Sequence, residues 1–297
     1  MRVFVTGGTG YVGAAVVRAL VAAGHEVTSL ARSAEKEADL ARLGARAVRG
    51  DLSDAPGIGA AARGHDAFVH AAMDYGLGPA ADRAALEALL GAARLGSSPR
   101  VLVYTSGVWV LGDTGSAGAD ESSETDHPAA AVAWRPAHER LALGSRTGDL
   151  VTAVVRPGLV YGGRGGLLGA LFEGAEKEGA SPVVGGGGNH WPLVHRDDLG
   201  QLYRLILEER ASGIFHGVDG EAPTQADVAA AASAAAGKGG AVKQLPLEEA
   251  RKAMGPMADA LALDQVVRGE ASHRLGWRPA WSGFLARAAD AFAEWRA

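Results

Sequence analysis

The sequence predicts an α/β protein in which a doubly wound parallel sheet carries helices on both faces and a smaller C-terminal lobe completes it. Short runs rich in β-branched residues alternate with longer amphipathic or alanine-rich stretches, the pattern of parallel strands joined by crossover helices. A glycine-rich turn follows the first strand, and the alternation loosens after Arg156. We therefore predict a Rossmann domain over residues 1–160 and a substrate lobe over 161–297, with segments of the lobe returning to the sheet.

The elements follow in chain order. We predict strands at Arg2–Thr6, Glu26–Leu30, Ala45–Arg49, Ala67–His70, Val101–Thr105 and Val151–Val155. We predict the connecting helices at Tyr11–Ala23, Ala34–Leu43, Pro79–Leu95 and Ala133–Ser145. In the second half we expect helices at Leu167–Glu178 and Leu199–Glu209, a strand at Ile214–Val218, and an alanine-rich helix within Ala229–Gly240.

Composition limits the class of protein. The chain has 297 residues, of which 47% are hydrophobic and 21% charged, with a formal net charge of −5 and no cysteine. These values exclude a disordered chain, and the lack of thiols excludes disulfides, thiolate metal sites and thiol nucleophiles. The acidic balance argues against a nucleic-acid partner. With no apolar stretch of about 18 residues and no N-terminal secretory signal, we expect no membrane association and a cytoplasmic protein.

The turn Thr6–Gly13 carries the strongest functional signal. Its glycines at positions 7, 10 and 13 follow a strand and open a helix, as in dinucleotide-binding folds. The first glycine permits the tight turn, the second lets the backbone approach a pyrophosphate, and the third lets helix and strand pack closely. The helix N-terminus offers free N–H groups to the phosphates. Cofactor contacts are expected from Gly7, Thr9, Gly10, Tyr11 and Val12.

The end of the second strand indicates which dinucleotide binds. NAD-binding proteins usually place an acidic residue there, whereas this chain has Arg32 and Ser33. A guanidinium and a hydroxyl suit a 2′-phosphate, so we predict NADP(H) as the cofactor. Further contacts are expected after the third and fourth strands, from Asp51, Leu52, Ala71, Ala72 and Met73.

Together these motifs resemble the atypical or extended short-chain dehydrogenase/reductase superfamily, which includes NAD(P)-dependent epimerases and dehydratases and NmrA-like relatives. The resemblance extends over most of the chain and includes Val103–Ser106, Arg156–Gly162 and Val194–Asp198. It implies that Thr105, Pro157, Gly158 and Val160 contact the cofactor, and that helices Pro79–Leu95 and Ala133–Ser145 are compatible with a homodimer interface.

The catalytic signature of that family is incomplete. Relatives use a serine or threonine after the fifth strand and a Tyr-x-x-x-Lys pair on the next helix, but here Gly107 takes the hydroxyl position and no tyrosine lies between residues 105 and 160. One register places Ala131 at the tyrosine position and Arg135 at the lysine position. The other pairs Trp134 with tyrosine and His138 with lysine. We prefer the first, because its spacing to Arg156 is closer to that of the family.

Nearby side chains must take over the roles of the missing tyrosine and lysine. Arg135 can hold the ribose but cannot act as an acid near neutral pH, whereas His138 could titrate and Ser106 could bind the substrate oxygen. We therefore predict Ser106, Arg135 and His138 as catalytic residues. The expected substrate pocket is lined by Tyr75, Trp109, His190 and Trp191. Asp197 and Asp198 are interpreted as helix capping, and we expect no metal site.

The sequence thus predicts an NADP(H)-dependent oxidoreductase that reduces or redox-isomerises a small, partly apolar carbonyl or unsaturated substrate. Two alternatives stay open: a sugar-nucleotide epimerase or dehydratase, and a non-catalytic NmrA-like protein that senses the NADP redox state.

Overall fold

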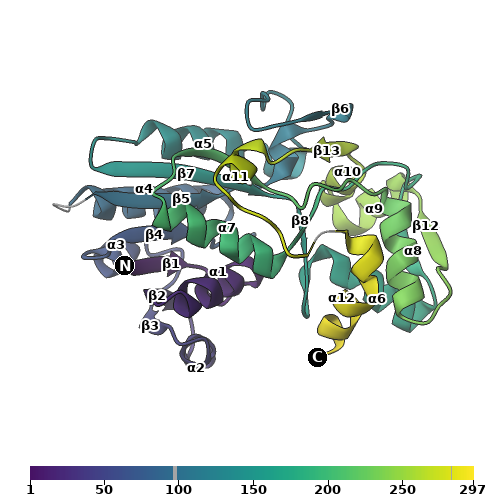
Figure 1. The fold of residues 1–297 in the computed structure, drawn as a ribbon, viewed down its shortest axis with the longest axis horizontal. Coiled ribbons are helices and arrows are strands. Elements are labelled where there is room, and N and C mark those ends of the chain that lie inside the picture. The colour runs from purple at the N-terminus through teal and green to yellow at the C-terminus, as the bar shows by residue number, and fades with distance from the viewer. Residues whose placement is uncertain (96–98, 282) are drawn as a thin grey trace.

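A seven-stranded parallel sheet forms the centre of the computed structural model, which describes residues 1–95, 99–281 and 283–297 (Figure 1). Its strand order is β3-β2-β1-β4-β5-β7-β11, so the order reverses between β1 and β4. The strands are β1 (Arg2–Thr6), β2 (Glu26–Ala31), β3 (Arg46–Arg49), β4 (Ala67–His70), β5 (Arg100–Thr105), β7 (Leu150–Pro157) and β11 (Gly213–Gly217). This is the predicted doubly wound Rossmann sheet, and ligands bind such sheets at the carboxyl ends beside the reversal.

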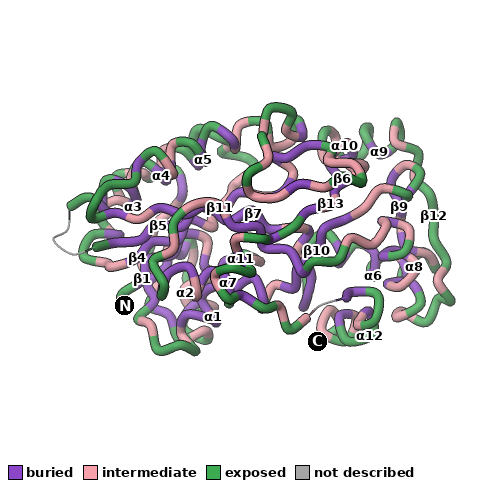
Figure 2. Tube along the Cα trace, turned by 45° about the horizontal axis from the view of Figure 1, so that its top comes forward, coloured by how far each residue is buried: buried purple, intermediate pink, exposed green. Residues whose placement is uncertain are grey.

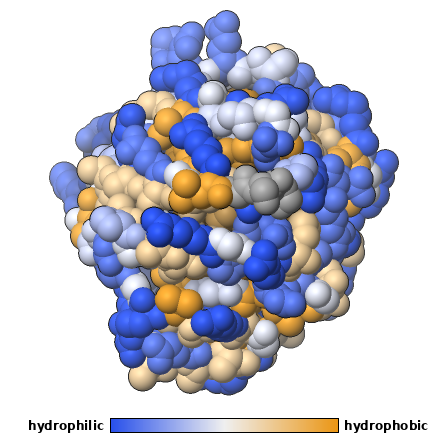
Figure 3. Space-filling view, turned by 90° about the vertical axis from the view of Figure 1, so that its left-hand side faces the viewer, coloured by the Kyte–Doolittle hydropathy of each residue, from blue (hydrophilic) through white to orange (hydrophobic). Residues whose placement is uncertain are grey.

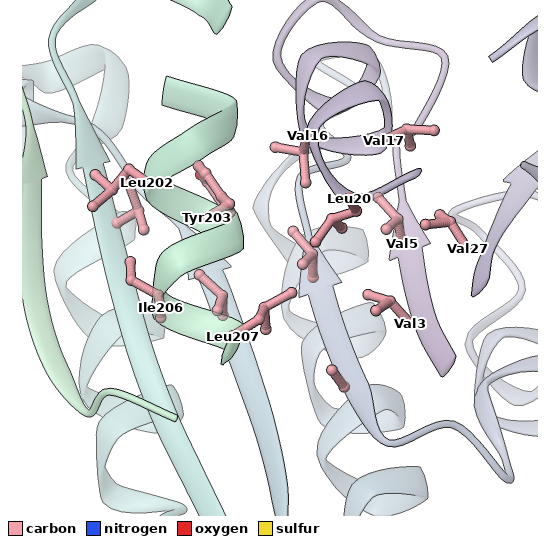
Figure 4. Close-up of a cluster of buried hydrophobic side chains, with 14 of the residues drawn as sticks. Val3, Val5, Val16, Val17, Leu20, Val27, Leu202, Tyr203, Ile206 and Leu207 are labelled. Atoms are coloured by element: carbon pink, nitrogen blue, oxygen red, sulfur yellow. The ribbon is translucent and has the colours of Figure 1, made fainter. Parts of the chain in front are cut away.

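Helices cover both faces of the sheet, because alternate strand residues point to opposite sides. On one face lie α1 (Tyr11–Ala22), α2 (Ala34–Arg42) and α7 (Arg196–Glu208); on the other lie α3 (Ala55–Ala62), α4 (Gly78–Arg94) and α5 (Arg135–Gly144). Figure 4 shows side chains of α1 and α7 converging on Val3 and Val5 of β1. Phe4 points the other way and packs with α3 and α4. Figure 2 shows the buried residues along the sheet and the exposed ones on the outer surfaces of the helices.

The C-terminal half builds a smaller lobe at the opposite end of the molecule from α3 (Figure 1). Its helices are α6 (Gly166–Glu178), α8 (Gln225–Ala235), α9 (Leu247–Met254), α10 (Met257–Leu261) and α12 (Phe284–Arg296), whereas α11 (Glu270–Arg274) packs on β11 of the main sheet. Three further parallel strand pairs lie outside the main sheet: β6 (Gly115–Ala119) with β13 (Gln265–Val267), β8 (Leu159–Tyr161) with β10 (Leu193–His195), and, within the lobe, β9 (Ser181–Val184) with β12 (Val242–Leu245). Short 3-10 helices η1 (Val108–Leu111) and η2 (Ala130–Val132) connect β5 to α5.

The predicted strands and helices of the first half are confirmed to within a few residues, and helix α3 is an addition. Beyond residue 160, strand β11 extends the main sheet beside β7, and α7 packs on α1. The residue at which the substrate lobe begins stays a prediction.

The contacts of Asp198 differ from the helix capping expected from the sequence. His195 is the N-cap of α7 and accepts a hydrogen bond from the Asp197 N–H at 3.3 Å. The Asp198 carboxylate instead accepts from the N–H groups of Ala280 and Trp281, at 2.9 and 2.7 Å. Capping by Asp198 was therefore the wrong interpretation, because its side chain ties the C-terminal segment to α7.

A buried ion pair fixes α5 against the sheet. Arg156, near the end of β7, donates to both carboxylate oxygens of Glu139 on α5, with the shortest N···O distance at 2.6 Å. The two side chains are only 3% and 4% exposed. His216 of β11 lies beside them, with its Nε2 3.4 Å from Arg156 Nη1 and its Nδ1 2.9 Å from the carbonyl oxygen of Arg268. Burial lowers the pKa of His216 to about 4, so the neutral ring accepts from the guanidinium and donates to the carbonyl.

One end of the molecule presents a mostly polar surface. Figure 3 shows that the face at the α3 end is mostly hydrophilic, with hydrophobic residues in small separate patches. Within the described ranges, no helix combines the length and apolar character needed to cross a membrane.

The Glu139–Arg156 pair leads to a stability prediction. Glu139→Gln leaves the Arg156 charge buried without its counterion, so we expect a loss of about 3–5 kcal/mol in the free energy of unfolding, measured by urea titration. Glu87→Gln is the matched control, since Glu87 pairs with Arg83 on exposed α4 surface and should change stability by less than about 0.5 kcal/mol. Equal losses in the two variants would contradict a structural role for the buried pair.

Candidate cofactor and substrate site

The glycine turn between β1 and α1 is packed too tightly for side chains. Gly7 has φ +76°, and a Cβ there would lie 2.6 Å from the Cα of Ala72 in the loop after β4. A Cβ on Gly13 would lie 2.0 Å from the Gly7 carbonyl oxygen, so the third glycine does permit close packing of helix on strand. Gly10 caps α1 without a side-chain hydrogen bond, which leaves the first N–H groups of the helix open to a ligand.

A cavity of about 440 Å³ lies beside this turn, and we call it the glycine-loop cavity. Expected cofactor residues line it: Gly7, Thr9, Gly10, Tyr11, Val12, Arg32, Asp51, Leu52, Ala71, Ala72 and Met73. Gly50, which belongs to the same expected motif as Asp51 and Leu52, also lines it, as does Tyr75 of the expected substrate pocket. Three lining residues were not predicted from the sequence: Leu30, Lys36 and Asp74. The carboxyl ends of β1, β2, β3 and β4 thus meet around one cavity, as the strand-order reversal requires.

Cations gather at the β2 end of the glycine-loop cavity. Arg32 and Lys36 both line it, with Lys36 one helical turn further along the chain. The sequence signal that could have identified Lys36 is its position in the first helical turn after Arg32, the predicted phosphate-binding arginine. Arg32 is paired with Asp74, with 3.0 Å between Nη1 and Oδ2. Ser33 is not among the lining residues; its hydroxyl caps α2 and accepts from the Lys36 N–H at 3.3 Å, and its expected role at the phosphate stays a prediction.

Asp51 lies on the wall formed after β3. The Ser53 hydroxyl and backbone N–H both donate to its Oδ1, at 2.7 and 2.9 Å. These hydrogen bonds lower the pKa of Asp51, so its carboxylate is charged at neutral pH and can accept from a polar group in the cavity.

A second cavity, of about 260 Å³, adjoins the first, and we call it the Ser106 cavity. Tyr11, Val12 and Tyr75 line both, so the two spaces meet at these side chains. The remaining wall is formed by Ser106, Gly107, Val108, Trp109, Val132, Arg135, Pro157, Gly158, Leu159, Val160, Gly166 and Leu167. The expected residues Ser106, Arg135, Trp109, Tyr75, Pro157, Gly158 and Val160 therefore lie together.

Ser106 and Arg135 form the polar corner of the Ser106 cavity. Ser106 is only 7% exposed, and its hydroxyl has no hydrogen-bond partner among the described residues. Arg135 donates to the Thr105 carbonyl oxygen at 2.7 Å, and its guanidinium lies 4.6 Å from the centroid of the Trp134 ring. A buried hydroxyl without a partner is costly, so this corner is suited to an oxygen-bearing ligand.

The side chains at the start of α5 can be compared with the two registers, which place either Arg135 or His138 at the lysine position of the family. Arg135 reaches the Ser106 cavity, whereas His138 points away from it and is 5% exposed. Its Nδ1 lies 2.8 Å from Asp82 Oδ2 on α4. This geometry favours the register that gives Arg135 the lysine position. It corrects the expected catalytic role of His138, because a side chain bound to Asp82 behind the wall does not reach the cavity.

Asp82 is the centre of a buried polar cluster beneath the site. Besides His138, it accepts from the Tyr104 hydroxyl at 2.9 Å, and His70 Nε2 lies 3.6 Å from its other oxygen. His70 Nδ1 in turn lies 2.7 Å from the Thr6 hydroxyl. Burial alone would raise the pKa of Asp82, but the hydrogen bond with His138 and the charges of its neighbours hold it below the usual value. The carboxylate is therefore a fixed negative charge near Arg135.

Three further expected residues lie outside both cavities. Trp191 is 4% exposed, packs in the lobe core and donates from Nε1 to the Leu261 carbonyl oxygen. His190 pairs with Asp264, with 2.7 Å between Nδ1 and Oδ1. The Thr105 hydroxyl lies 2.7 Å from the hydroxyl of Tyr203. The expected pocket positions of Trp191 and His190 were wrong, because partners more than 60 residues later in the chain hold them in the lobe.

Comparisons with known proteins now identify the family. The model of the NAD-dependent epimerase/dehydratase family matches residues 3–216. The chain belongs to that family. The extended short-chain dehydrogenase/reductase resemblance is thereby confirmed, and the chain is a member of a superfamily of NAD(P)-dependent epimerases, dehydratases and reductases.

Individual relatives cover much of the molecule. The uncharacterized protein C2A9.02 of Schizosaccharomyces pombe is 32% identical over 307 residues, covering 98% of this chain and all of the relative. The 2-alkyl-3-oxoalkanoate reductase of Stenotrophomonas maltophilia is 30% identical over 224 residues, covering 72% of this chain and 67% of the enzyme. The structure of human epimerase family protein SDR39U1 with NADPH superposes with a TM-score of 0.80 at 24% identity, covering 99% of both chains.

For this member of the epimerase/dehydratase family, the glycine turn leads to a prediction. Gly13→Ala places a methyl group against the Gly7 carbonyl, so we expect a loss of about 1–3 kcal/mol in unfolding free energy and weaker dinucleotide binding. Gly91→Ala is the matched helix control, since a Cβ there has nothing within 4 Å and alanine should stabilise α4 by about 0.5–1 kcal/mol. Urea unfolding and fluorescence titration measure both effects. A Gly13→Ala protein as stable as the wild type would rule out the packing role.

Proposed function

We propose that this protein is an NADPH-dependent oxidoreductase that reduces the carbonyl group of a small, partly apolar substrate. The observation that carries the proposal is the Ser106 cavity, where an unpartnered hydroxyl and a guanidinium form one polar corner within apolar walls. This space adjoins the glycine-loop cavity, so a substrate there would contact the nicotinamide end of a dinucleotide.

The residues present fit NADPH. The Gly7 turn and the open N-terminus of α1 suit the pyrophosphate, and Arg32 with Lys36 suits the 2′-phosphate. SDR39U1, which matches this chain in sequence at 29% identity over 256 residues, binds NADPH in its structure. When bound, NADPH supplies the hydride.

The polar corner has two roles in carbonyl reduction. As the carbonyl carbon accepts a hydride, the π electrons move to the oxygen, which becomes negatively charged. The Ser106 hydroxyl donates a hydrogen bond to this oxygen, and the permanent charge of Arg135 stabilises it. In this proposal Arg135 stands where relatives keep a lysine, and Ser106 acts from the position next to the usual hydroxyl, which is Gly107.

The proton comes from Tyr75. Among the described residues that line the Ser106 cavity, the titratable side chains are those of Tyr11, Tyr75 and Arg135. The Tyr11 hydroxyl donates to the Gly162 carbonyl oxygen, and burial raises its pKa well above the ordinary value. Arg135 does not deprotonate near neutral pH. Tyr75 is 78% exposed, so its phenol can give a proton to the substrate oxygen and regain one from water.

The walls of the cavity favour a ketone over a sugar nucleotide. Val108, Trp109, Leu159 and Leu167 supply mostly apolar surface. The Stenotrophomonas relative is named as a reductase of 2-alkyl-3-oxoalkanoates, which combine a ketone with alkyl chains. Epimerisation of a sugar begins by oxidising a hydroxyl group, and α5 lacks the tyrosine that relatives use for that step.

Cofactor preference tests the role of Arg32. We expect the wild type to bind NADPH at least tenfold more tightly than NADH, because Arg32 and Lys36 pair with the 2′-phosphate. Arg32→Ala should lose most of this difference through weaker NADPH binding, with NADH affinity unchanged. Fluorescence titration of both cofactors measures the four dissociation constants, and a wild-type preference for NADH would refute the assignment.

Substrate reduction tests Ser106. Purified protein with NADPH should reduce members of a panel of 3-oxo esters and cyclic ketones, followed by the loss of absorbance at 340 nm, a property of the reduced cofactor. Ser106→Ala should lower kcat by about 10²-fold, as removal of an oxyanion donor does, while the NADPH dissociation constant stays unchanged. Full activity in Ser106→Ala would exclude the hydroxyl from the reaction.

Variants of Tyr75 test whether its phenol supplies the proton. Tyr75→Phe keeps the ring but removes the acid, so we expect kcat to fall by about 10²-fold, within the range of general acid catalysis, with the NADPH dissociation constant unchanged. Tyr75→His should retain part of the rate and shift the pH profile towards lower pH, since imidazole titrates near pH 6.5. A Tyr75→Phe rate equal to wild type would show that water or another group supplies the proton.

A further inference from the structure

A carboxylate lies inside the cavity at the point where the 2′-phosphate is expected. Asp74, in the loop after β4, lines the glycine-loop cavity, and its Oδ2 accepts from Arg32 Nη1 at 3.0 Å. The guanidinium is 66% exposed and the carboxylate 28% exposed. Carboxylates and phosphates bind a guanidinium through the same N–H groups, so Asp74 holds the side chain that the proposed function assigns to the cofactor.

The two oxygens of Asp74 have separate partners. Oδ1 accepts from the N–H groups of Gly76 and Leu77, at 2.9 and 3.2 Å, and so holds the turn that carries Tyr75. Oδ2 is the oxygen that binds Arg32. An asparagine could keep the turn through its amide oxygen, but it would carry no charge towards Arg32. The effects of the turn and of the charge can therefore be separated by substitution.

The other charges around this end of the cavity do not replace Asp74. Lys36 is paired with Asp39 on its own helix, with 3.0 Å between Nζ and Oδ2. Arg49 of β3 pairs with Glu37 and donates to the Arg32 carbonyl oxygen. Asp51 is bound by Ser53. Among the described residues, Asp74 is the acidic side chain in contact with the Arg32 guanidinium.

We propose that Asp74 is an internal competitor for Arg32, which the 2′-phosphate must displace, and that it thereby lowers the affinity for NADPH but not for NADH. The inference rests on the proposed use of NADPH. A 2′-phosphate carries more negative charge than the carboxylate and has three acceptor oxygens, so it wins the guanidinium. Displacement costs part of its binding free energy, and NADH, which lacks the phosphate, leaves the pair intact.

The expected size of the effect is modest. An exposed ion pair contributes little in water, so its removal should change the NADPH dissociation constant by about three- to fivefold. The charge of Asp74 also repels the phosphate through solvent, and salt screens that repulsion. The difference between wild type and variant should therefore shrink as ionic strength rises.

The experiment is a double-mutant cycle in cofactor binding. The dissociation constants of NADPH and NADH are measured by fluorescence titration for wild type, Asp74→Asn, Arg32→Ala and the double variant. We expect Asp74→Asn to bind NADPH about three- to fivefold more tightly with unchanged NADH affinity, and this gain to vanish in the Arg32→Ala background. Asp74→Ala also loses the turn, and thermal unfolding shows whether its fold is intact.

The matched control is Asp290→Asn. Asp290 pairs with Arg287 on α12, at 3.2 Å, and lines neither cavity. It changes the net charge of the protein by the same amount, so NADPH affinity should stay at the wild-type value.

Three results would overturn the inference: unchanged or weaker NADPH binding in Asp74→Asn, equal tightening for both cofactors, or a gain that persists without Arg32. Failure of the proposed function is distinct, because it appears as a wild-type preference for NADH. In that case the NADPH arm of the cycle still reports on Asp74. Binding of neither cofactor by the wild type would overturn both.

Discussion

The buried pair between Arg156 and Glu139 is the constraint on which the geometry of the site depends. Two charges removed from water are stable only when they meet with good geometry, so the pair fixes the rotation of α5 against β7. Arg135 lies one helical turn before Glu139 and is thereby directed to the Ser106 cavity. Pro157 follows Arg156 directly and also lines this cavity. One ion pair thus lies close in the chain to two parts of the cavity wall, on α5 and on β7.

The same rotation of α5 directs two of its polar side chains, Arg135 and His138, to different places. His138, adjacent to Glu139, is turned towards α4, where Asp82 binds it. The Asp82 cluster connects α4, α5, β4 and β5, and through Thr6 it reaches the glycine turn. Burial lowers the pKa of His70, so this part of the cluster is neutral. The titratable groups of the Asp82 cluster therefore have a mainly structural role. The polar corner of the Ser106 cavity is formed by Ser106 and Arg135.

The fold could be predicted because its signals are local. Strand runs such as Val3–Val5 and the glycine turn need only neighbouring residues to be recognised. Helix α3 was missed because Ala55–Ala62 contains proline and glycine and has little amphipathic pattern. The short strand pairs of the lobe were missed because their partners are distant, as for Gly115 and Gln265. Pattern recognition along the chain does not supply such pairings.

Most residues expected to contact the cofactor line one of the two cavities, whereas several of those expected at the reactive end do not. Residues after each sheet strand had to meet at one edge, whereas the side chains of α5 and of the lobe loops depend on rotations that partners such as Asp82 and Asp264 decide. Ser33 shows the limit within the cofactor end itself, since a hydroxyl at a helix start can cap the helix or face the ligand. In the structure the Lys36 N–H donates to this hydroxyl, so Ser33 caps α2.

In the proposed reaction, the two tasks of the family tyrosine are divided between different residues. In relatives one residue binds the oxygen and moves the proton, and a lysine tunes its pKa. Here the charge that would stabilise the oxygen is permanent, because a guanidinium does not titrate near neutral pH, and the proposed acid, Tyr75, lies on the turn held by Asp74. Oxygen binding is thus assigned to Ser106 after β5 and Arg135 on α5, and proton transfer to the loop after β4. This loop also contacts Arg32, so in this arrangement the proton donor is positioned from the phosphate end of the cofactor cavity.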